Sequence, residues 1–293
     1  MNTVLVTGSA GFLGRAVCML LHGRGIRTVG VDPQQNEITG YQSFADDLTD
    51  RKRIAEYLAF YGVTHIIHCG GISSPALATP DRIIATNTGD SINLALAAYD
   101  ANVRRLVFAS SIAARNPQDA YGYSKAATEL ALRALNAQSP GRFLALRFAG
   151  IYGPGRRTAI LPHDLIAAAL NHAKFELPEP SVRHYIFIDD AAAAAVQACF
   201  AVTALEAFYD IAFPDHVTTL DLARAVQKLL PSFRFDVQQP GDALAPSNVD
   251  IAPATRDFGF TPQINAEAGI RRIIAWMSTP SCSRQKFSHA ATT

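Results

Sequence analysis

Residues 3–14, Thr-Val-Leu-Val-Thr-Gly-Ser-Ala-Gly-Phe-Leu-Gly, decide the fold of this chain. The apolar run 3–7 predicts a buried strand, and the apolar residues that follow Gly11 recur at helical spacing. Between them, Gly8 can take a tight turn, Gly11 lets the backbone approach a phosphate, and Gly14 permits close packing of helix on strand. The first turn of the helix offers unpaired N–H groups to an anion. This strand, turn and helix therefore predict a pyrophosphate site for a dinucleotide.

The rest of the first half repeats this alternation of short apolar runs with longer amphipathic segments. Further buried strands are predicted at 26–32, 65–69, 105–110 and 143–148. Parallel neighbours need helical crossovers. We therefore expect an α/β fold with a doubly wound parallel sheet of the Rossmann type over residues 1–150.

After Gly150 the pattern changes, because prolines divide the chain into short pieces. We expect a smaller substrate-binding lobe over residues 151–277. Within it, a strand at 182–188 and an alanine-rich helix at 189–200 form one further βα unit, so that 182–200 is expected to return to the first domain. The small, polar residues 278–293 carry no pattern and predict a disordered tail.

The composition is that of a globular protein. Of the 293 residues, 49% are hydrophobic and 17% are charged, and 26 basic and 25 acidic side chains leave a net charge of +1. These charges are dispersed, so they create no field that would attract nucleic acid or an anionic membrane. The sequence shows neither a membrane-spanning run nor a signal peptide, and its four cysteines have no metal-ligand spacing. We expect a cytoplasmic protein with a small-molecule substrate and without metal, nucleic acid or membrane partners.

Asp32 ends the second predicted strand, eighteen positions after Gly14. A carboxylate there can accept hydrogen bonds from the adenosine ribose hydroxyls. It would repel a 2′-phosphate, and no Lys or Arg occurs between Asp32 and Arg51 to neutralise it. NAD is therefore favoured over NADP as the cofactor. The cofactor contacts expected from this region are Gly8, Ala10, Gly11, Phe12, Leu13, Gly14 and Asp32.

Tyr121 and Lys125 stand four residues apart, on one face of a predicted helix. A phenol titrates near pH 10, at about the value for free tyrosine, so it needs a neighbouring cation to act as a base near neutrality, and Lys125 supplies one. Ser111 ends the preceding strand, where open α/β sheets bind ligands. It is expected to hold the substrate oxygen while Tyr121 exchanges the proton. Ser111, Tyr121 and Lys125 thus predict hydride transfer at a hydroxyl-bearing carbon.

These features together resemble the extended short-chain dehydrogenase/reductase family, the NAD-dependent epimerase/dehydratases. The resemblance covers residues 3–277 and includes Asn87-Thr88-Gly89, Tyr152-Gly153-Pro154-Gly155 and Phe258-Gly259-Phe260-Thr261-Pro262. It implies adenine contacts from Asp47 and Leu48 and cofactor packing by the strand end at 68–71. The cofactor contacts expected on this basis are Asp47, Leu48, Cys69, Gly70, Gly71, Asn87, Ser110, Tyr121 and Lys125. The resemblance also implies a homodimer formed through the helices that carry Asn87 and Tyr121.

Two departures bear on the substrate. The nucleotide-sugar epimerases of the family usually carry Asn where Gly150 stands and a Tyr-Gly pair where Arg115-Asn116 stands, which weakens a nucleotide-sugar assignment. The turn at 68–73 instead resembles that of the uronate dehydrogenases, in which a serine contacts a sugar acid. Arginines after residue 155 can pair a carboxylate or phosphate. The substrate contacts we expect are Ser73, Ser111, Gly150, Arg157 and Arg183.

Three functions remain open at this point. The first is a net dehydrogenase or reductase that acts on a sugar, a sugar acid or a similar small hydroxy compound. The second is an epimerase or dehydratase that transfers a hydride transiently on a nucleotide sugar. The third is a protein that binds NAD without catalysis, which the presence of Ser111, Tyr121 and Lys125 disfavours.

Overall fold

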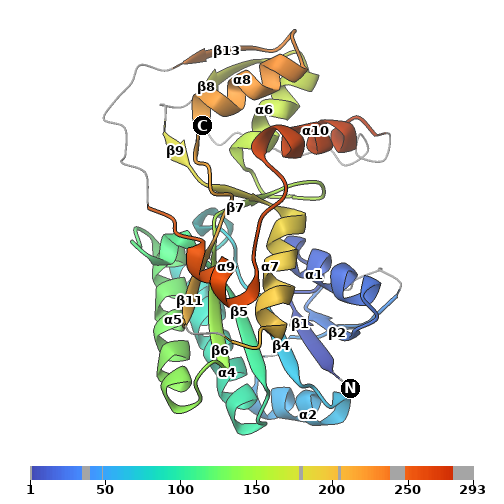
Figure 1. Ribbon diagram of the computed structural model, residues 1–293, viewed down its shortest axis with the longest axis vertical. Coiled ribbons are helices and arrows are strands. Elements are labelled where there is room, and N and C mark those ends of the chain that lie inside the picture. Colours follow the sequence, from blue (N-terminus) through green and yellow to red (C-terminus); the bar gives the residue numbers. More distant parts are fainter. Residues whose placement is uncertain are drawn as a thin grey trace. The chain divides into compact units, whose positions relative to one another are not determined.

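The computed structural model describes residues 2–34, 40–47, 49–177, 181–203, 206–237 and 248–279. The chain forms two compact units (Figure 1). The first unit contains Met1–Ala149, Asp189–Ile211 and Asp250–Thr261, and the second contains Gly150–Ile188, Ala212–Val249 and Pro262–Thr293.

The first unit is built on a parallel sheet, in which seven strands lie in the order β11-β6-β5-β4-β1-β2-β3 within the described residues. The strand β1 lies inside the sheet, and the chain winds outward from it in both directions. The winding reverses between β1 and β4, the position at which doubly wound folds bind ligands. The predicted Rossmann-type fold is therefore confirmed. The strands are β1 (Thr3–Thr7), β2 (Arg27–Asp32), β3 (Gln42–Ala45), β4 (His65–His68), β5 (Arg105–Ser111), β6 (Phe143–Phe148) and β11 (Phe208–Ile211).

Helices pack on both faces of this sheet (Figure 1). Leu5 of β1 belongs to a core cluster that includes Ile54, Leu94 and Leu132 from three helices on one face. Val4 alternates with Leu5 and is also fully buried, so it faces the other side. The helices of this unit are α1 (Phe12–Gly23), α2 (Arg51–Tyr61), α3 (Pro80–Ile84), a π-helical turn (Ala85–Asp90), α4 (Ser91–Asp100), α5 (Ala120–Gln138), α7 (Ile188–Phe200) and α9 (Ala252–Phe258).

The second unit consists of short strand pairs and three helices within its described residues. β10 pairs in parallel with β7, β13 in parallel with β8, and β12 antiparallel with β9. Proline-rich connections explain the short pieces, since proline cannot donate to a strand ladder. The elements are β7 (Gly150–Tyr152), α6 (Leu161–Leu170), β8 (Lys174–Leu177), β9 (Val182–Arg183), β10 (Tyr185–Phe187), β12 (Val217–Thr218), α8 (Thr219–Leu229), β13 (Arg234–Val237) and α10 (Ala266–Met277).

The expected return of 182–200 to the first domain is wrong for the strand. The segment 182–188 forms β9 and β10, and β10 pairs with β7 of the second unit. The helix α7 from Asp189 onward belongs to the first unit. The strand that extends the sheet is β11, which pairs with β6 and was not predicted. Of the expected tail, residues from 280 onward lie outside the described residues.

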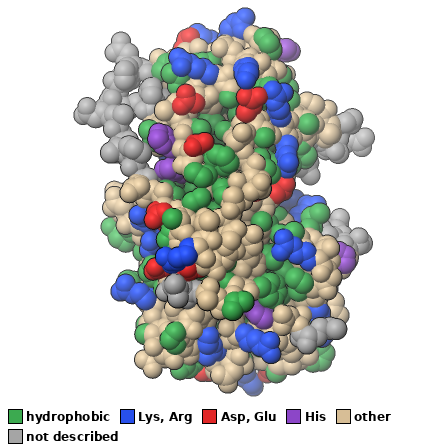
Figure 2. Space-filling view, viewed as in Figure 1, with side chains coloured by type: hydrophobic (Ala, Val, Ile, Leu, Met, Phe, Trp, Pro, Cys, Tyr) green, Lys and Arg blue, Asp and Glu red, His purple; other side chains and the backbone are tan. Residues whose placement is uncertain are grey.

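Basic and acidic side chains are interspersed over the face shown in Figure 2. Among the described helices, none is both long enough and apolar enough to span a bilayer. In the same part of the chain, no group of three or more His, Cys, Asp or Glu side chains is arranged to hold a metal ion.

Candidate active site

The glycine turn after β1 is too tightly packed for side chains. Gly8 has a φ of +67°, and a Cβ atom there would lie 2.6 Å from the amide nitrogen of Gly70. A Cβ atom on Gly14 would lie 2.1 Å from the carbonyl oxygen of Gly8, so α1 begins directly against the turn. The N-cap of α1 is Gly11, which brings no side chain to the first N–H groups. The helix therefore retains donors for an anion.

The end of β4 closes the turn from the neighbouring strand. His68 pairs in register with Thr7, whose Oγ1 lies 2.5 Å from His68 Nδ1. The other ring nitrogen, Nε2, lies 2.8 Å from Ser91 Oγ. Burial, with a smaller effect of Lys125, lowers the pKa of His68 to about 3, so its ring is neutral. His68 thus joins β1, β4 and α4, and it fixes the segment 69–71 beside the turn.

Asp32 ends β2 beside the same turn. Its Oδ2 accepts a hydrogen bond of 3.2 Å from the amide of Ala10, and its Oδ1 accepts one of 2.8 Å from the amide of Gln34. An ionised carboxylate has about four lone-pair sites, so two backbone bonds leave capacity for ribose hydroxyls. The cradle at Gly8 and Gly14, the uncapped helix and this carboxylate fit an NAD molecule.

Of the two residues expected to contact the adenine, the structure describes one. Asp47 follows β3 and its side chain is exposed. The neighbouring Asp46 is already used, because its Oδ2 accepts hydrogen bonds from Arg53 Nη2 at 2.7 Å and from the Tyr57 hydroxyl at 2.8 Å. Of the two acids, Asp47 is therefore the one available to a ligand. Leu48 lies outside the described residues.

Helix α5 brings Lys125 beside Tyr121. Lys125 is 5% exposed, and its Nζ donates a hydrogen bond of 2.8 Å to the carbonyl oxygen of Ala109. The same atom lies 4.5 Å from the centroid of the Phe108 ring and 5.9 Å from that of Tyr121. Burial lowers the pKa of Lys125 to about 8, while Cys69 and Glu129 act in the opposite direction. The side chain is therefore still mainly an ammonium at neutral pH.

Ser111 lies two residues beyond the carbonyl that holds Lys125, at the end of β5. Its Oγ accepts a hydrogen bond of 3.2 Å from the amide of Ala113. The first turn of α5 packs closely against the segment that follows Ser111, since a Cβ atom on Gly122 would lie 3.1 Å from the carbonyl oxygen of Ala113. The end of β5 at Ser111 and the start of α5 at Tyr121 therefore lie close together.

Asn87 joins the β4 end to α5. It lies in the π-helical turn, and such turns are frequent at functional sites. Its side-chain Oδ1 accepts from the amide of Ile72 at 2.7 Å, and its Nδ2 donates to the Ile72 carbonyl at 3.0 Å and to Ser124 Oγ at 3.2 Å. Its amide group is therefore engaged within the protein. The backbone of Gly71 lies close to both Asn87 and Lys125, because a Cβ atom at Gly71 would lie 2.8 Å from Asn87 Oδ1 and 3.7 Å from Lys125 Nζ.

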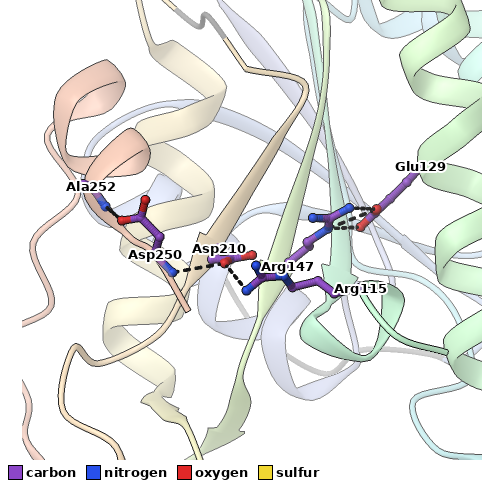
Figure 3. Close-up of polar contacts among 6 residues, drawn as sticks. All are labelled: Arg115, Glu129, Arg147, Asp210, Asp250 and Ala252. Atoms are coloured by element: carbon purple, nitrogen blue, oxygen red, sulfur yellow. Dashed lines mark hydrogen bonds and ion pairs between the residues drawn. The ribbon is translucent and has the colours of Figure 1, made fainter. Parts of the chain in front are cut away.

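A buried ion pair that lies next to Ser110 was not predicted from the sequence. Arg147 of β6 bonds Glu129 of α5 through Nε at 2.9 Å and 3.1 Å and through Nη2 at 2.5 Å (Figure 3). The Ser110 hydroxyl donates to Glu129 Oε1 at 2.6 Å, so its hydrogen is not available to a cofactor. Two features of the sequence could have indicated this pair. Glu129 stands one helical turn after Lys125, and Arg147 is the single charged residue in the apolar run 143–148.

The remaining predicted substrate contacts lie in two places. Ser73 is exposed in the loop between β4 and the 3₁₀ turn Pro75–Leu77 of the first unit. Gly150, Arg157 and Arg183 belong to the second unit. Arg157 and Arg183 are exposed, and Arg183 Nε donates to Ser181 Oγ at 3.1 Å. A Cβ atom on Gly150 would lie 3.0 Å from Cδ1 of Tyr185, so this ring occupies the space that a larger side chain would enter.

Comparisons with known proteins agree with this arrangement. The chain is 26% identical to the UDP-glucose 4-epimerase of Bacillus subtilis (strain 168), over 94% of this chain and 97% of that enzyme. It is 24% identical to the dTDP-4-dehydro-6-deoxyglucose reductase of Escherichia coli, over 93% of this chain and 96% of that enzyme. The crystal structure of the Thermus thermophilus UDP-glucose 4-epimerase in complex with NAD matches with a TM-score of 0.79 and 25% identity, over 94% of this chain and 98% of that one.

The model of one protein family also matches residues 4–212, which include the glycine turn, the Ser111 strand end and the Tyr121–Lys125 helix turn. The match covers well over half of the chain and agrees with the resemblance seen in the sequence. The chain belongs to the NAD-dependent epimerase/dehydratase family and is an NAD-dependent enzyme.

Proposed function

We propose that the enzyme transfers a hydride at a hydroxyl-bearing carbon of a sugar, a sugar acid or a similar small hydroxy compound, with Tyr121 as the acid and base. The observation that carries the proposal is the buried ammonium of Lys125, 5.9 Å from the centroid of the Tyr121 ring at the carboxyl end of β5. Burying a charge costs free energy, and this cost is offset here if the ammonium stabilises the phenolate of its neighbour.

In the direction of oxidation, the phenolate of Tyr121 accepts the proton of the substrate hydroxyl. The ammonium of Lys125 favours this phenolate by Coulomb attraction, which is stronger in a buried site than in water. Ser111 donates a hydrogen bond to the substrate oxygen and orients the reacting carbon. NAD, when bound, supplies the hydride acceptor.

We assign the binding of NAD to residues of the first unit. The glycine turn and the start of α1 would hold the pyrophosphate. The Asp32 carboxylate would accept hydrogen bonds from the ribose hydroxyls, and Asp47 would contact the adenine. The segment 69–71 would pack against the cofactor at the reversal of the sheet between β1 and β4.

Two features support a substrate other than a nucleotide sugar. The nucleotide-sugar epimerases of the family usually carry Asn at the position of Gly150, and here the Tyr185 ring lies 3.0 Å from where a Cβ atom would be. The position of the usual Tyr-Gly pair is held by Arg115, whose Nη1 bonds Asp210 Oδ2 at 2.9 Å. Arg183 remains a candidate to bind the acid group of a sugar acid, because a guanidinium pairs a carboxylate bidentately.

The alternative is an epimerase or dehydratase of nucleotide sugars with transient hydride transfer. The match along nearly the whole length of the Bacillus subtilis UDP-glucose 4-epimerase favours this alternative. The two functions differ in the fate of the hydride. A dehydrogenase releases NADH in proportion to its product, whereas an epimerase or dehydratase converts substrate without net NADH.

The experiment is a screen of purified protein with polyols, sugar acids and nucleotide sugars in the presence of NAD. Absorbance of the reduced nicotinamide and chromatography of the products are followed together. Product with equimolar NADH supports our proposal, and product without NADH supports the alternative. Tyr121→Phe should reduce kcat by about 100-fold or more, the range for loss of a general base. Tyr123→Phe is the matched control, since Tyr123 is 61% exposed on the same helix turn.

A further inference from the structure

The buried ion pair of Arg147 and Glu129 lies in a longer row of alternating charges. Arg147 of β6 is in register with Ser110 of β5 on one side and with Asp210 of β11 on the other. Side chains of register partners in adjacent parallel strands project from the same face. Asp210 acts on Arg147 by Coulomb attraction and forms an ion pair with Arg115, and Figure 3 shows both arginine side chains between Asp210 and Glu129. We call Glu129, Arg147, Asp210 and Arg115 the charge row.

Two members of the charge row come from segments that carry a proposed catalytic group. Glu129 lies one helical turn after Lys125 and two turns after Tyr121 on α5. Arg115 ends the short 3₁₀ segment that follows Ser111. In addition, Ser110 donates its hydroxyl hydrogen to Glu129, and this serine is the immediate neighbour of Ser111.

Burial of the two carboxylates of the charge row costs free energy. The side chain of Glu129 is 3% exposed and that of Asp210 is 9% exposed. Burying an ion pair brings a desolvation penalty that its attraction often fails to offset, so such pairs are weak sources of stability. A bidentate guanidinium and carboxylate pair does, however, fix relative position and angle.

We propose that the charge row is a positioning device, in which Arg147 holds α5 in the register that sets Tyr121 and Lys125 opposite the Ser111 strand end. Arg147 and Glu129 are positioning residues in this assignment. The assignment rests on the proposed function of Ser111, Tyr121 and Lys125. Asp210 extends the same register to the edge strand, where its Oδ2 also accepts the amide of Asp250 at 3.2 Å.

Charge effects must be separated from positioning in any test. The titratable groups that act on Lys125 are Cys69 and His68 from the β4 end and Glu129 and Tyr121 from α5. Arg147→Lys keeps the charge but loses the planar fork. The double variant Glu129→Gln/Arg147→Gln keeps the net charge of the pair. A change seen in Arg147→Lys therefore reports geometry, because every charge is kept. The double variant also removes the effect of the Glu129 charge on Lys125, so it reports the loss of the whole pair.

The matched control is Tyr209→Phe. Tyr209 precedes Asp210 on β11, is 1% exposed and donates a hydrogen bond of 2.6 Å to Asp257. Neighbouring residues of a strand face opposite sides, so this variant removes a buried polar contact without touching the charge row. It reports the effect of a comparable structural defect.

We expect Arg147→Lys to lower kcat by about 10-fold or more with KM changed less than about 2-fold, because small displacements of reacting groups reduce rates steeply. The double variant should fold and show a similar loss, and Tyr209→Phe should keep kcat within about 2-fold of the parent at a lower melting temperature. Unchanged kcat, KM and pH profile in both charge-row variants would leave these residues a structural role only and overturn the proposal.

A second measurement needs no substrate. The phenol of Tyr121 is titrated by NMR of ring-labelled tyrosine, with Tyr121→Phe identifying its signal. If Lys125 is displaced, the pKa of Tyr121 rises in Arg147→Lys and stays at the parent value in Tyr209→Phe. An equal pKa in all three proteins contradicts the positioning role. If the parent enzyme turns over nothing in the substrate screen, the proposed function fails while this titration still decides the role of the charge row.

Discussion

The Nζ atom of Lys125 lies 5.9 Å from the centroid of the Tyr121 ring and donates a hydrogen bond to the strand that ends at Ser111. The groups that these contacts place directly against the ammonium are a backbone carbonyl and two aromatic rings, none of which carries a charge that would neutralise it. Its charge is consequently available to the phenol.

The pH dependence of turnover follows from the state of Lys125. Burial lowers its pKa to about 8, so the ammonium persists below that pH and is lost above it. The neutral amine cannot stabilise the Tyr121 phenolate. We expect kcat/KM for oxidation to fall as pH rises through about 8. The measurement is a pH profile with a substrate found in the screen, and a plateau that continues well above this pH would contradict the assignment.

Lys125→Met should make the protein more stable and less active. The folded state holds the ammonium at a pKa of about 8 against an ordinary 10.5, so at pH 7 the buried charge opposes folding. That penalty declines as pH rises from the folded to the unfolded value. After allowance for the lost bond to Ala109, we expect a gain of about 1–3 kcal/mol in the free energy of unfolding at pH 7.

Denaturant unfolding at pH 7 measures this gain, and the gain should shrink at higher pH. Lys52→Met, at an exposed position of α2, is the control and should change the free energy of unfolding by less than about 0.5 kcal/mol. A Lys125→Met protein that is less stable than the parent at pH 7 would show that the hydrogen bond to Ala109 outweighs the burial of charge.

Alanine substitutions at two glycines of α1 should have different effects on cofactor binding and on helix stability. Gly14→Ala places a methyl group 2.1 Å from the Gly8 carbonyl oxygen, so the turn must open and NAD affinity should fall by about 100-fold. At Gly23, an added Cβ atom would meet nothing within 4 Å, so Gly23→Ala should leave affinity unchanged while raising stability by up to about 1 kcal/mol. Fluorescence titration with NADH measures the affinity of each variant. Equal affinities for the two variants would show that the glycine turn does not bind the cofactor.

The sequence predicted the elements whose signals are local. The strand Thr3–Thr7 and the turn into α1 follow from apolar periodicity and glycine spacing, and they lie where expected. Tyr121 and Lys125 share a helix face because their spacing is that of one turn. Asp32 was placed at a strand end by the same kind of pattern.

The parts that were missed depend on contacts between distant segments. Glu129 and Arg147 meet only because α5 crosses β6, and Asp210 joins them through the register of β6 with β11. The strand 182–188 has the composition of a sheet strand, yet it pairs with β7, since the chain leaves the first unit at Gly150. No pattern within one segment carries such pairings.

The outer face of α5 predicts self-association. Tyr123 and Leu130 lie seven residues apart on this helix and are 61% and 57% exposed, and Ile84 of the adjoining α3 is 51% exposed. Residues two turns apart share a helix face, so Tyr123 and Leu130 form a stripe that a second copy of the chain would cover. We expect a homodimer, and Leu130→Glu should make it monomeric by burying an unpaired charge at the interface.

Light scattering during size-exclusion chromatography measures the mass of each species. Phe60→Glu is the matched control, because Phe60 is 81% exposed on α2 and lies outside the stripe. It should remain dimeric with the parent. Since α5 also carries Tyr121 and Lys125, the Leu130→Glu monomer should lose part of its turnover, and this loss should recover as protein concentration rises. A parent protein that is monomeric at every concentration would refute the stripe as an interface.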